Sequence, residues 1–284
     1  MELHLHLGAH KTASTHLQAS LIRDRDALAR RGVAFAPPSE VRALVRRGRE
    51  AAARLSPLPS LQALFAGRRL LRLGAETTRL VLSDENSLGR CAEMMSAAAL
   101  YPSASARIRI WRPLAAQRET TIYLAIRDYA PFFSGAFAQS IRDAAWRDAN
   151  ASKIAALSRR WPHVINEIRQ ALPDTRLILW NYADHEALAP DLLARMTGDD
   201  CAPVRRRPMA TPSQAAIDAL RGRKHISKAD FETAARTNPI GPSPRFSLFN
   251  TEQQADLSEQ FNQDLAQLRG EFGADFLSPK QAPA

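Results

Sequence analysis

The chain has 284 residues, of which 45% are hydrophobic and 24% charged, and its formal net charge is +10 at pH 7. This is the composition of a globular protein with enough length for a large core, and it excludes a fibrous or disordered chain. No apolar stretch approaches the roughly 18 residues that a membrane span requires, so we expect no transmembrane segment. The N-terminus lacks the pattern of a secretory signal, and Cys91 and Cys201 are the only cysteines. Both features predict a cytoplasmic protein in a reducing compartment.

The hydrophobic pattern predicts strands that alternate with helices. Strands are expected at residues 1–7, 33–36, 79–83, 121–126 and 175–180, and the segment 107–111 is either a strand or irregular. Helices are expected from Ser14 or Thr15 to Gly32, then over residues 39–74 with a break near the prolines at 57 and 59, 90–100, 131–142, 154–172 with a break at Pro162, 184–198, 212–221 and 250–272.

Strands that alternate with helices are typical of an α/β fold. We therefore expect a three-layer protein with a central, mostly parallel sheet of four to five strands flanked by helices. A single domain is expected over residues 1–278, followed by a frayed tail at 279–284. Ligands of such sheets bind at the carboxyl ends of the strands, and the segments 39–74 and 199–250 are expected to lie over that edge.

The loop after the first strand, residues 8–16, is the most informative part of the sequence. Gly-Ala-His-Lys-Thr-Ala-Ser-Thr-His supplies one ammonium, three hydroxyls and the start of a helix, which together suit a phosphate or sulfate group. It is not a Walker A loop. Lys11 follows Gly8 by only three residues, and the residue directly before the lysine is not glycine. Only five of the 39 basic residues are lysines, and Lys11 is the only one in the first 152 residues. Since lysine and arginine present their charge differently, this choice of residue favours a specific role for Lys11.

At these residues the sequence resembles the sulfotransferases that use 3′-phosphoadenosine 5′-phosphosulfate (PAPS), in the variant of bacterial, carbohydrate-sulfotransferase-like members. Three further segments, over residues 80–85, 122–134 and 171–184, are similar to later strands and turns of that family, which has a P-loop-like fold. Ala13 stands where the family usually has glycine. Gly135 stands where the family has a serine, and Ser134 is its neighbour.

The resemblance implies roles for particular residues. The loop would hold the phosphosulfate through His10, Lys11, Thr12, Ala13, Ser14 and Thr15, and the 3′-phosphate would be held by Arg127 and Ser134. Lys11 would stabilise the charge that builds up on the oxygen of the departing phosphate. Glu85 would be the general base that takes the proton of an acceptor hydroxyl on a carbohydrate or glycolipid, with His10 and His163 as alternatives. No metal is expected to take part.

Three other functions compete with this interpretation. A P-loop NTPase or small-molecule kinase would use the acidic residue after the strand at 79–83 to hold Mg²⁺. A metal site could form from His4, His6, His10 and His16. A basic nucleic-acid-binding protein would fit the net charge, but the basic residues are spread along the chain and no aromatic and basic platform is visible, so no nucleic-acid partner is expected.

Overall fold

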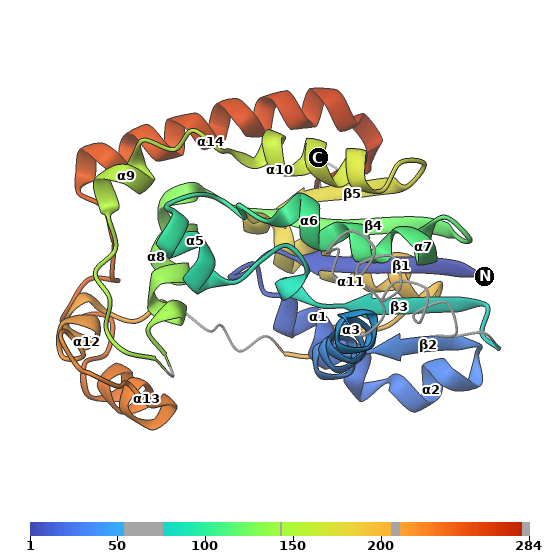
Figure 1. Cartoon of the computed structure of the whole chain (residues 1–284), viewed down its shortest axis with the longest axis horizontal. Coiled ribbons are helices and arrows are strands. Elements are labelled where there is room, and N and C mark those ends of the chain that lie inside the picture. Colours follow the sequence, from blue (N-terminus) through green and yellow to red (C-terminus); the bar gives the residue numbers. More distant parts are fainter. Residues whose placement is uncertain (54–75, 143, 206–210, 280–284) are drawn as a thin grey trace, which may run out of the picture.

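The computed structural model of the chain describes residues 1–53, 76–142, 144–205 and 211–279. Its centre is a sheet of six parallel strands in the order β2-β3-β1-β4-β5-β6 (Figure 1). The strands are β1 (Glu2–Gly8), β2 (Val33–Ala36), β3 (Arg79–Ser83), β4 (Glu119–Ile126), β5 (Arg176–Asn181) and β6 (Phe276–Leu277). The parallel α/β sheet and its five predicted strands are confirmed. The sixth strand was not predicted, because two residues are too few to show a periodic pattern.

Helices flank the sheet on both faces, which makes the three layers of the predicted fold. They are α1 (Ser14–Arg23), α2 (Arg25–Arg30), α3 (Pro38–Ala53), α5 (Cys91–Ala97), α6 (Ala104–Ile108), α7 (Arg112–Ala115), α8 (Tyr129–Ser140), α9 (Ala151–Ala155), α10 (Trp161–Ala171), α11 (His185–Thr197), α12 (Gln214–Asp218), α13 (Lys228–Thr237) and α14 (Thr251–Phe272).

Alternation along the strands divides the core between the two faces of the sheet, because successive side chains point to opposite faces. On β1 the residues Leu3, Leu5 and Leu7 pack with α5, α6, α8, α10 and α14 on one face. The opposite face packs against α1, α2 and α11, and there Tyr123 of β4 and Trp180 of β5 are fully covered. His4 and His6, which alternate with the leucines, are buried as well.

Three local predictions need correction. The segment 107–111 is neither a strand nor irregular, because it continues α6 into a 3-10 turn. The helix expected from Ser14 to Gly32 is divided at Asp24 into α1 and α2. Its expected cap is also wrong: Ala13 occupies the N-cap position in a left-handed conformation, and no side chain caps the first turn. Asp184 is the N-cap residue of α11 as predicted, although its side chain makes no capping hydrogen bond.

The segment 199–250 contains more structure than its composition indicated. Besides the predicted helix near 212–221, it forms α13, which Ser227 and Asp230 begin with a capping box. A separate apolar cluster joins α12 and α13 to the end of α8 through Phe137, Ile217 and Phe246. Figure 1 shows these two helices beyond the carboxyl ends of the strands, where the segment was expected to lie.

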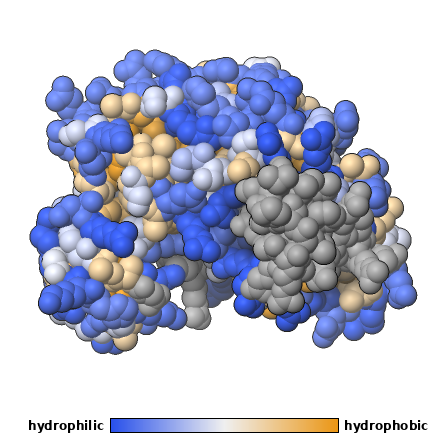
Figure 2. Space-filling view, in the orientation of Figure 1, coloured by the Kyte–Doolittle hydropathy of each residue, from blue (hydrophilic) through white to orange (hydrophobic). Residues whose placement is uncertain are grey.

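Some predictions fall outside the described residues, namely the helix after Ala53 with its break near the prolines at 57 and 59, and the tail at 280–284. The final helix starts where it was predicted, since the Asn250 side chain accepts a hydrogen bond from the Gln253 backbone. No helix in the described parts of the chain is long and apolar enough to cross a membrane. The face seen in Figure 2 is mainly hydrophilic.

Candidate active site

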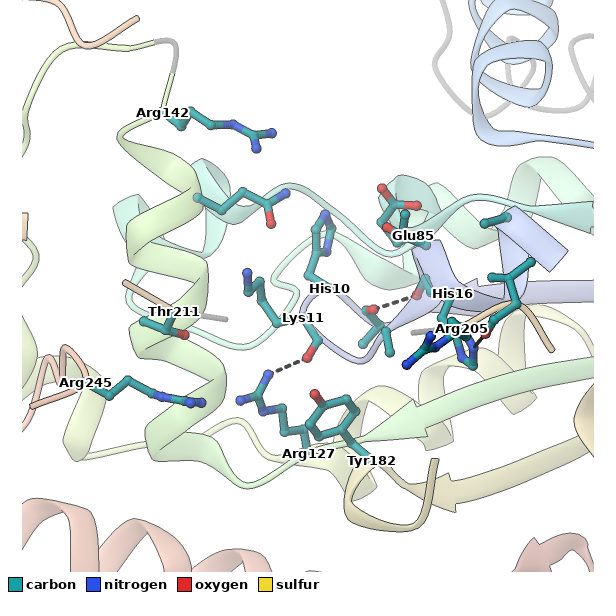
Figure 3. A pocket seen from close by; sticks show the side chains of 17 residues that line it. His10, Lys11, His16, Glu85, Arg127, Arg142, Tyr182, Arg205, Thr211 and Arg245 are labelled. Carbon is teal, nitrogen blue, oxygen red and sulfur yellow. Dashed lines mark hydrogen bonds between the residues drawn. The ribbon is translucent and has the colours of Figure 1, made fainter. Parts of the chain in front are cut away.

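A cavity of about 510 Å³ lies at the carboxyl edge of the sheet, next to the loop between β1 and α1 (Figure 3). The charged side chains that line it, among the described residues, are one carboxylate and five cations: Glu85, Lys11, Arg127, Arg142, Arg205 and Arg245. Lysine and arginine carry donors and no acceptors, so the cavity matches a ligand with several anionic groups.

The loop is held in shape by its own hydroxyl groups. The Thr12 Oγ1 donates to the carbonyl oxygen of Ala9 at 2.7 Å, and the Ser14 Oγ donates to the same oxygen at 3.1 Å. Lys11 and Ala13 both have φ of 60°. Left-handed backbone favours glycine, so non-glycine residues at both positions are uncommon. Ala13, Ser14 and Thr15 line the cavity, so α1 begins against it. Because no side chain caps this first turn, its backbone N–H groups are suited to an anion.

Lys11 extends from this loop toward α8 (Figure 3). Its side chain is partly buried, and this burial lowers the pKa of its ammonium. The guanidinium groups of Arg127 and Arg142 lower the same pKa further, because they are like charges close by. A bound anion would offset this repulsion.

Arg127 follows β4 directly and reaches the first loop. Its Nη1 donates a hydrogen bond to the carbonyl oxygen of Lys11, a residue 116 positions earlier in the sequence. The guanidinium lies 4.5 Å from the centre of the Tyr182 ring, and the Trp161 indole donates to the Arg127 carbonyl oxygen at 2.8 Å. The predicted pair of Lys11 and Arg127 therefore shares one cavity.

Glu85 follows β3 and approaches the loop closely. Its Cβ lies 2.8 Å from the point where a side chain on Gly8 would begin, and Gly8 has a φ of +98°, so glycine is required there on both counts. One Glu85 oxygen accepts from Arg42 of α3 at 2.7 Å, and the other accepts from the Gln18 amide at 3.2 Å. Burial raises the pKa of Glu85, but the charge of Arg42 together with the hydrogen bonds from the Glu85 backbone and the Gln18 amide lowers it by more, so the net shift is downward. Glu85 is thus an ionised carboxylate in a hydrogen-bonded setting.

The neighbouring acid, Asp84, differs from Glu85. Arg42 also donates to Asp84, at 2.7 Å, yet the pKa of Asp84 is raised, because burial and the like charge of Glu85 together exceed the effect of the ion pair. A single guanidinium thus ties α3 to both acids at the end of β3.

The two alternative bases lie in different places. His10 lines the cavity, with Nδ1 3.0 Å from the Tyr101 hydroxyl and Nε2 2.9 Å from the side-chain amide of Asn86. Burial lowers its pKa, so the ring is neutral. His163 lies on the first turn of α10, where its Nδ1 accepts from the Arg160 backbone at 3.3 Å, and it lines a separate surface hollow. The geometry therefore gives His163 no part in this cavity.

Two predicted ligand residues do not line the cavity with their side chains. Thr12 is buried and faces the inside of its own loop. Ser134 is buried on α8, where its hydroxyl donates to the Ala130 carbonyl at 2.7 Å and accepts from the Leu248 backbone at 3.1 Å. The Ser134 hydroxyl therefore holds the segment before α14 on α8, and it does not face the cavity that contains Lys11 and Arg127.

Several cavity residues were missed by sequence reasoning. Arg142 follows α8, and Arg205 and Arg245 come from the segment 199–250 that was expected over this edge. In a chain with 34 arginines, none of the three carried a signal of its own. Tyr182 lies in the segment 171–184 but was given no role, although the turn after β5 belongs to the edge of the sheet where ligands bind.

The histidines near the N-terminus have separate partners. His4 Nδ1 lies 3.0 Å from the Tyr123 hydroxyl, and His6 Nδ1 lies 2.8 Å from the Ser83 hydroxyl. Burial lowers the pKa of His6 to about 4. His16 lines the cavity and contacts His185 on α11, with 3.1 Å between the two ring nitrogens. Among the described residues, no three histidine, cysteine or acidic side chains gather as metal ligands do.

Neither a scan against protein-family models nor a search of curated proteins finds a match.

Proposed function

We propose that the chain is a PAPS-dependent sulfotransferase that moves a sulfuryl group to an acceptor hydroxyl. The observation that carries the proposal is the hydrogen bond between Arg127 and the Lys11 carbonyl oxygen, at the edge of one cationic cavity. PAPS has an anionic group at each end of a nucleoside, and it needs two neighbouring cationic sites. Lys11 and the start of α1 suit the phosphosulfate, and Arg127 suits the 3′-phosphate. The cavity volume of about 510 Å³ falls within the usual range for small-molecule sites.

In the proposed reaction, the acceptor oxygen forms a bond to sulfur while the bond from sulfur to the 5′-phosphate oxygen breaks. That oxygen leaves with the electron pair, as part of 3′-phosphoadenosine 5′-phosphate (PAP). The Lys11 ammonium would stabilise its growing negative charge, which is larger in the transition state than in the substrate. The acceptor proton would pass to a general base.

Glu85 is the base that the arrangement supports best. It lines the same cavity and its pKa is lowered, so it is ionised and able to accept a proton at neutral pH. Its contact with Arg42 limits its basicity, which makes Arg42 part of the proposed chemistry. A carbohydrate or glycolipid is the acceptor class that we propose from the resemblance, together with a cytoplasmic location.

The test is incubation of the purified chain with radiolabelled PAPS and fractionated extracts of the source cell. We expect a labelled product that does not require Mg²⁺ and that the Lys11→Ala variant fails to form. A kinase or P-loop NTPase would instead bind ATP with Mg²⁺ in preference to PAP, and that preference would contradict the proposal. Salt-sensitive binding to generic DNA without PAP binding would favour a nucleic-acid partner.

A further inference from the structure

Gly135 is unusual because it lies in the middle of a helix, where its backbone conformation does not require glycine. It belongs to α8, and its φ is not among the positive values in the chain. Glycine within a helix costs about 1 kcal/mol relative to alanine, so a close neighbour is the usual reason to keep it. The neighbours here come from two other segments, and both line the candidate active site.

The space above Gly135 is occupied by the stem of Lys11. A methyl group on Gly135 would lie 3.0 Å from the Lys11 Cε and 3.2 Å from the Lys11 Cγ. It would also lie 3.2 Å from the Thr211 Oγ1. All three distances are shorter than ordinary contacts between carbon atoms and their neighbours, which are near 3.5–4.0 Å. Figure 3 shows Lys11 and Thr211 beside α8.

We propose that Gly135 is a positioning residue, whose missing side chain forms the seat in which the Lys11 stem lies and so fixes the ammonium in the cavity. A methyl group at residue 135 would meet the lysine at both Cγ and Cε, so the space left by the glycine extends along the stem from near its root to the carbon that bears the ammonium. An alanine at residue 135 would require this stem to move by a few tenths of an ångström, toward the open part of the cavity. The effect on turnover rests on the proposed function, whereas the packing between Gly135 and Lys11 does not.

The first experiment measures stability in a double-mutant cycle. Gly135→Ala and Lys11→Ala are made singly and together, and thermal melting is followed by circular dichroism. Gly270→Ala is the matched control, because Gly270 also lies within a helix, α14, and nothing lies within 4 Å of the position of its added methyl. We expect Gly270→Ala to raise the melting temperature. Gly135→Ala should raise it less or lower it while Lys11 is present, and should raise it more once Lys11 is alanine.

The second experiment follows Lys11 itself. The pH dependence of its acylation, read by mass spectrometry, gives the pKa of its amine. Burial lowers this pKa in the native chain, so displacement toward the open cavity should return it toward the ordinary lysine value in Gly135→Ala, but not in Gly270→Ala. Sulfuryl transfer should fall by about tenfold to a hundredfold in kcat, since small misplacements of a reacting group have effects of this size. In the Lys11→Ala background, Gly135→Ala should cause no additional loss.

The outcomes separate this inference from the proposed function. If Gly135→Ala and Gly270→Ala stabilise the chain equally, with the Lys11 pKa unchanged, then Gly135 is not a seat for Lys11. If the native chain neither binds PAP nor transfers sulfate, the proposed function fails. In that case the melting cycle and the acylation data still decide whether Gly135 positions Lys11.

Discussion

At the scale of single residues, substitution of Lys11 gives the most direct test of the proposed chemistry. We expect Lys11→Ala to keep the fold and to lower turnover by about two to three orders of magnitude, the size of a lost transition-state donor. Lys11→Arg keeps the charge, but the wider guanidinium must fit beside Gly135 of α8. Only partial rescue is therefore expected. Full activity of the arginine variant in a radiolabelled PAPS assay would show that the ammonium has no special position.

Arg127 carries a second prediction, about binding. We expect Arg127→Ala to weaken binding of PAP far more than binding of adenosine 5′-phosphate, because only PAP has a 3′-phosphate. Loss of a charged hydrogen-bond partner costs about 1.5–3 kcal/mol. Isothermal titration calorimetry with both nucleotides measures the difference. Arg127 also donates to the Lys11 carbonyl oxygen, so a loss of affinity that both nucleotides share would report a change in the shape of the first loop. Equal losses would remove Arg127 from the 3′-phosphate role.

The sequence pointed to these two residues for different reasons. Lys11 stood out because the chain has few lysines, and Arg127 because it follows a clear buried strand. The three other cavity arginines had neither signal. The sequence marked Gly135 only as a departure from the pattern that this segment resembles. Its packing against Lys11 could not be predicted, because it depends on where a loop 124 positions earlier places one side chain.

At the scale of elements, α3 acts on the end of β3 through Arg42. Burial raises the pKa of Glu85, and the ion pair with Arg42 is the largest of the interactions that together lower it below its ordinary value. In Arg42→Ala burial remains and the pair is lost, so the pKa of Glu85 should rise. If Glu85 is the base, it works only when ionised, and the acidic limb of the pH–rate profile should move up by roughly one pH unit.

A stability measurement checks the same ion pair without a substrate. A carboxylate whose pKa is lowered in the folded state stabilises the fold at pH values above its ordinary pKa. This contribution is lost as the pH falls through the lowered pKa. The difference in unfolding free energy between native chain and Arg42→Ala should therefore be larger at neutral pH than in acid. Arg25→Ala is the control, because Arg25 of α2 also pairs with a carboxylate of α3, Glu40, but on the exposed surface. A pH profile of Arg42→Ala that matches this control would separate Arg42 from Glu85.

Other elements show how far local patterns can predict structure. The first strand was found from its alternating leucines, the later ones from short apolar runs, and the final helix from apolar residues at helical spacing after Asn250, a residue type that caps helices. The start of α1 was misjudged because both Ser14 and Thr15 are good capping residues. In the folded chain the Ser14 hydroxyl is instead bound to the Ala9 carbonyl, an interaction of the loop that periodicity does not describe.

At the scale of the whole molecule, Tyr129 joins three helices that pack on one face of the sheet. It is fully buried at the start of α8, its hydroxyl donates to Asp264 of α14, and it accepts from the Trp161 backbone of α10 at 2.8 Å. We expect Tyr129→Phe to lower the unfolding free energy by about 1–3 kcal/mol, since Asp264 and the Trp161 N–H lose a buried partner. Urea unfolding measures this loss. A variant as stable as the native chain would show that this junction adds nothing to stability.

The order of the strands and the helices between them brings all the cavity residues to one edge, and this level of the fold was predictable. Parallel strands end at the same edge, so the loops after β1, β3 and β4 had to be neighbours. The placement of α12 and α13 could not be predicted to the same degree. Their cluster with α8 depends on contacts such as that of Phe137 with Phe246, which are far apart in the sequence.

The alanine at the N-cap of α1 has a thermodynamic consequence for the whole fold. Alanine is a poor cap, and no side chain replaces it, so an anion bound in the cavity would supply acceptors to the first backbone N–H groups of the helix. Ligand binding and folding are then linked equilibria, and the concentration of the anion enters the stability of the protein by mass action. At a hundredfold excess over its dissociation constant, a ligand specific for the native state adds about 2.7 kcal/mol. A cell that depletes the ligand would thereby also lower the resistance of this chain to unfolding and proteolysis.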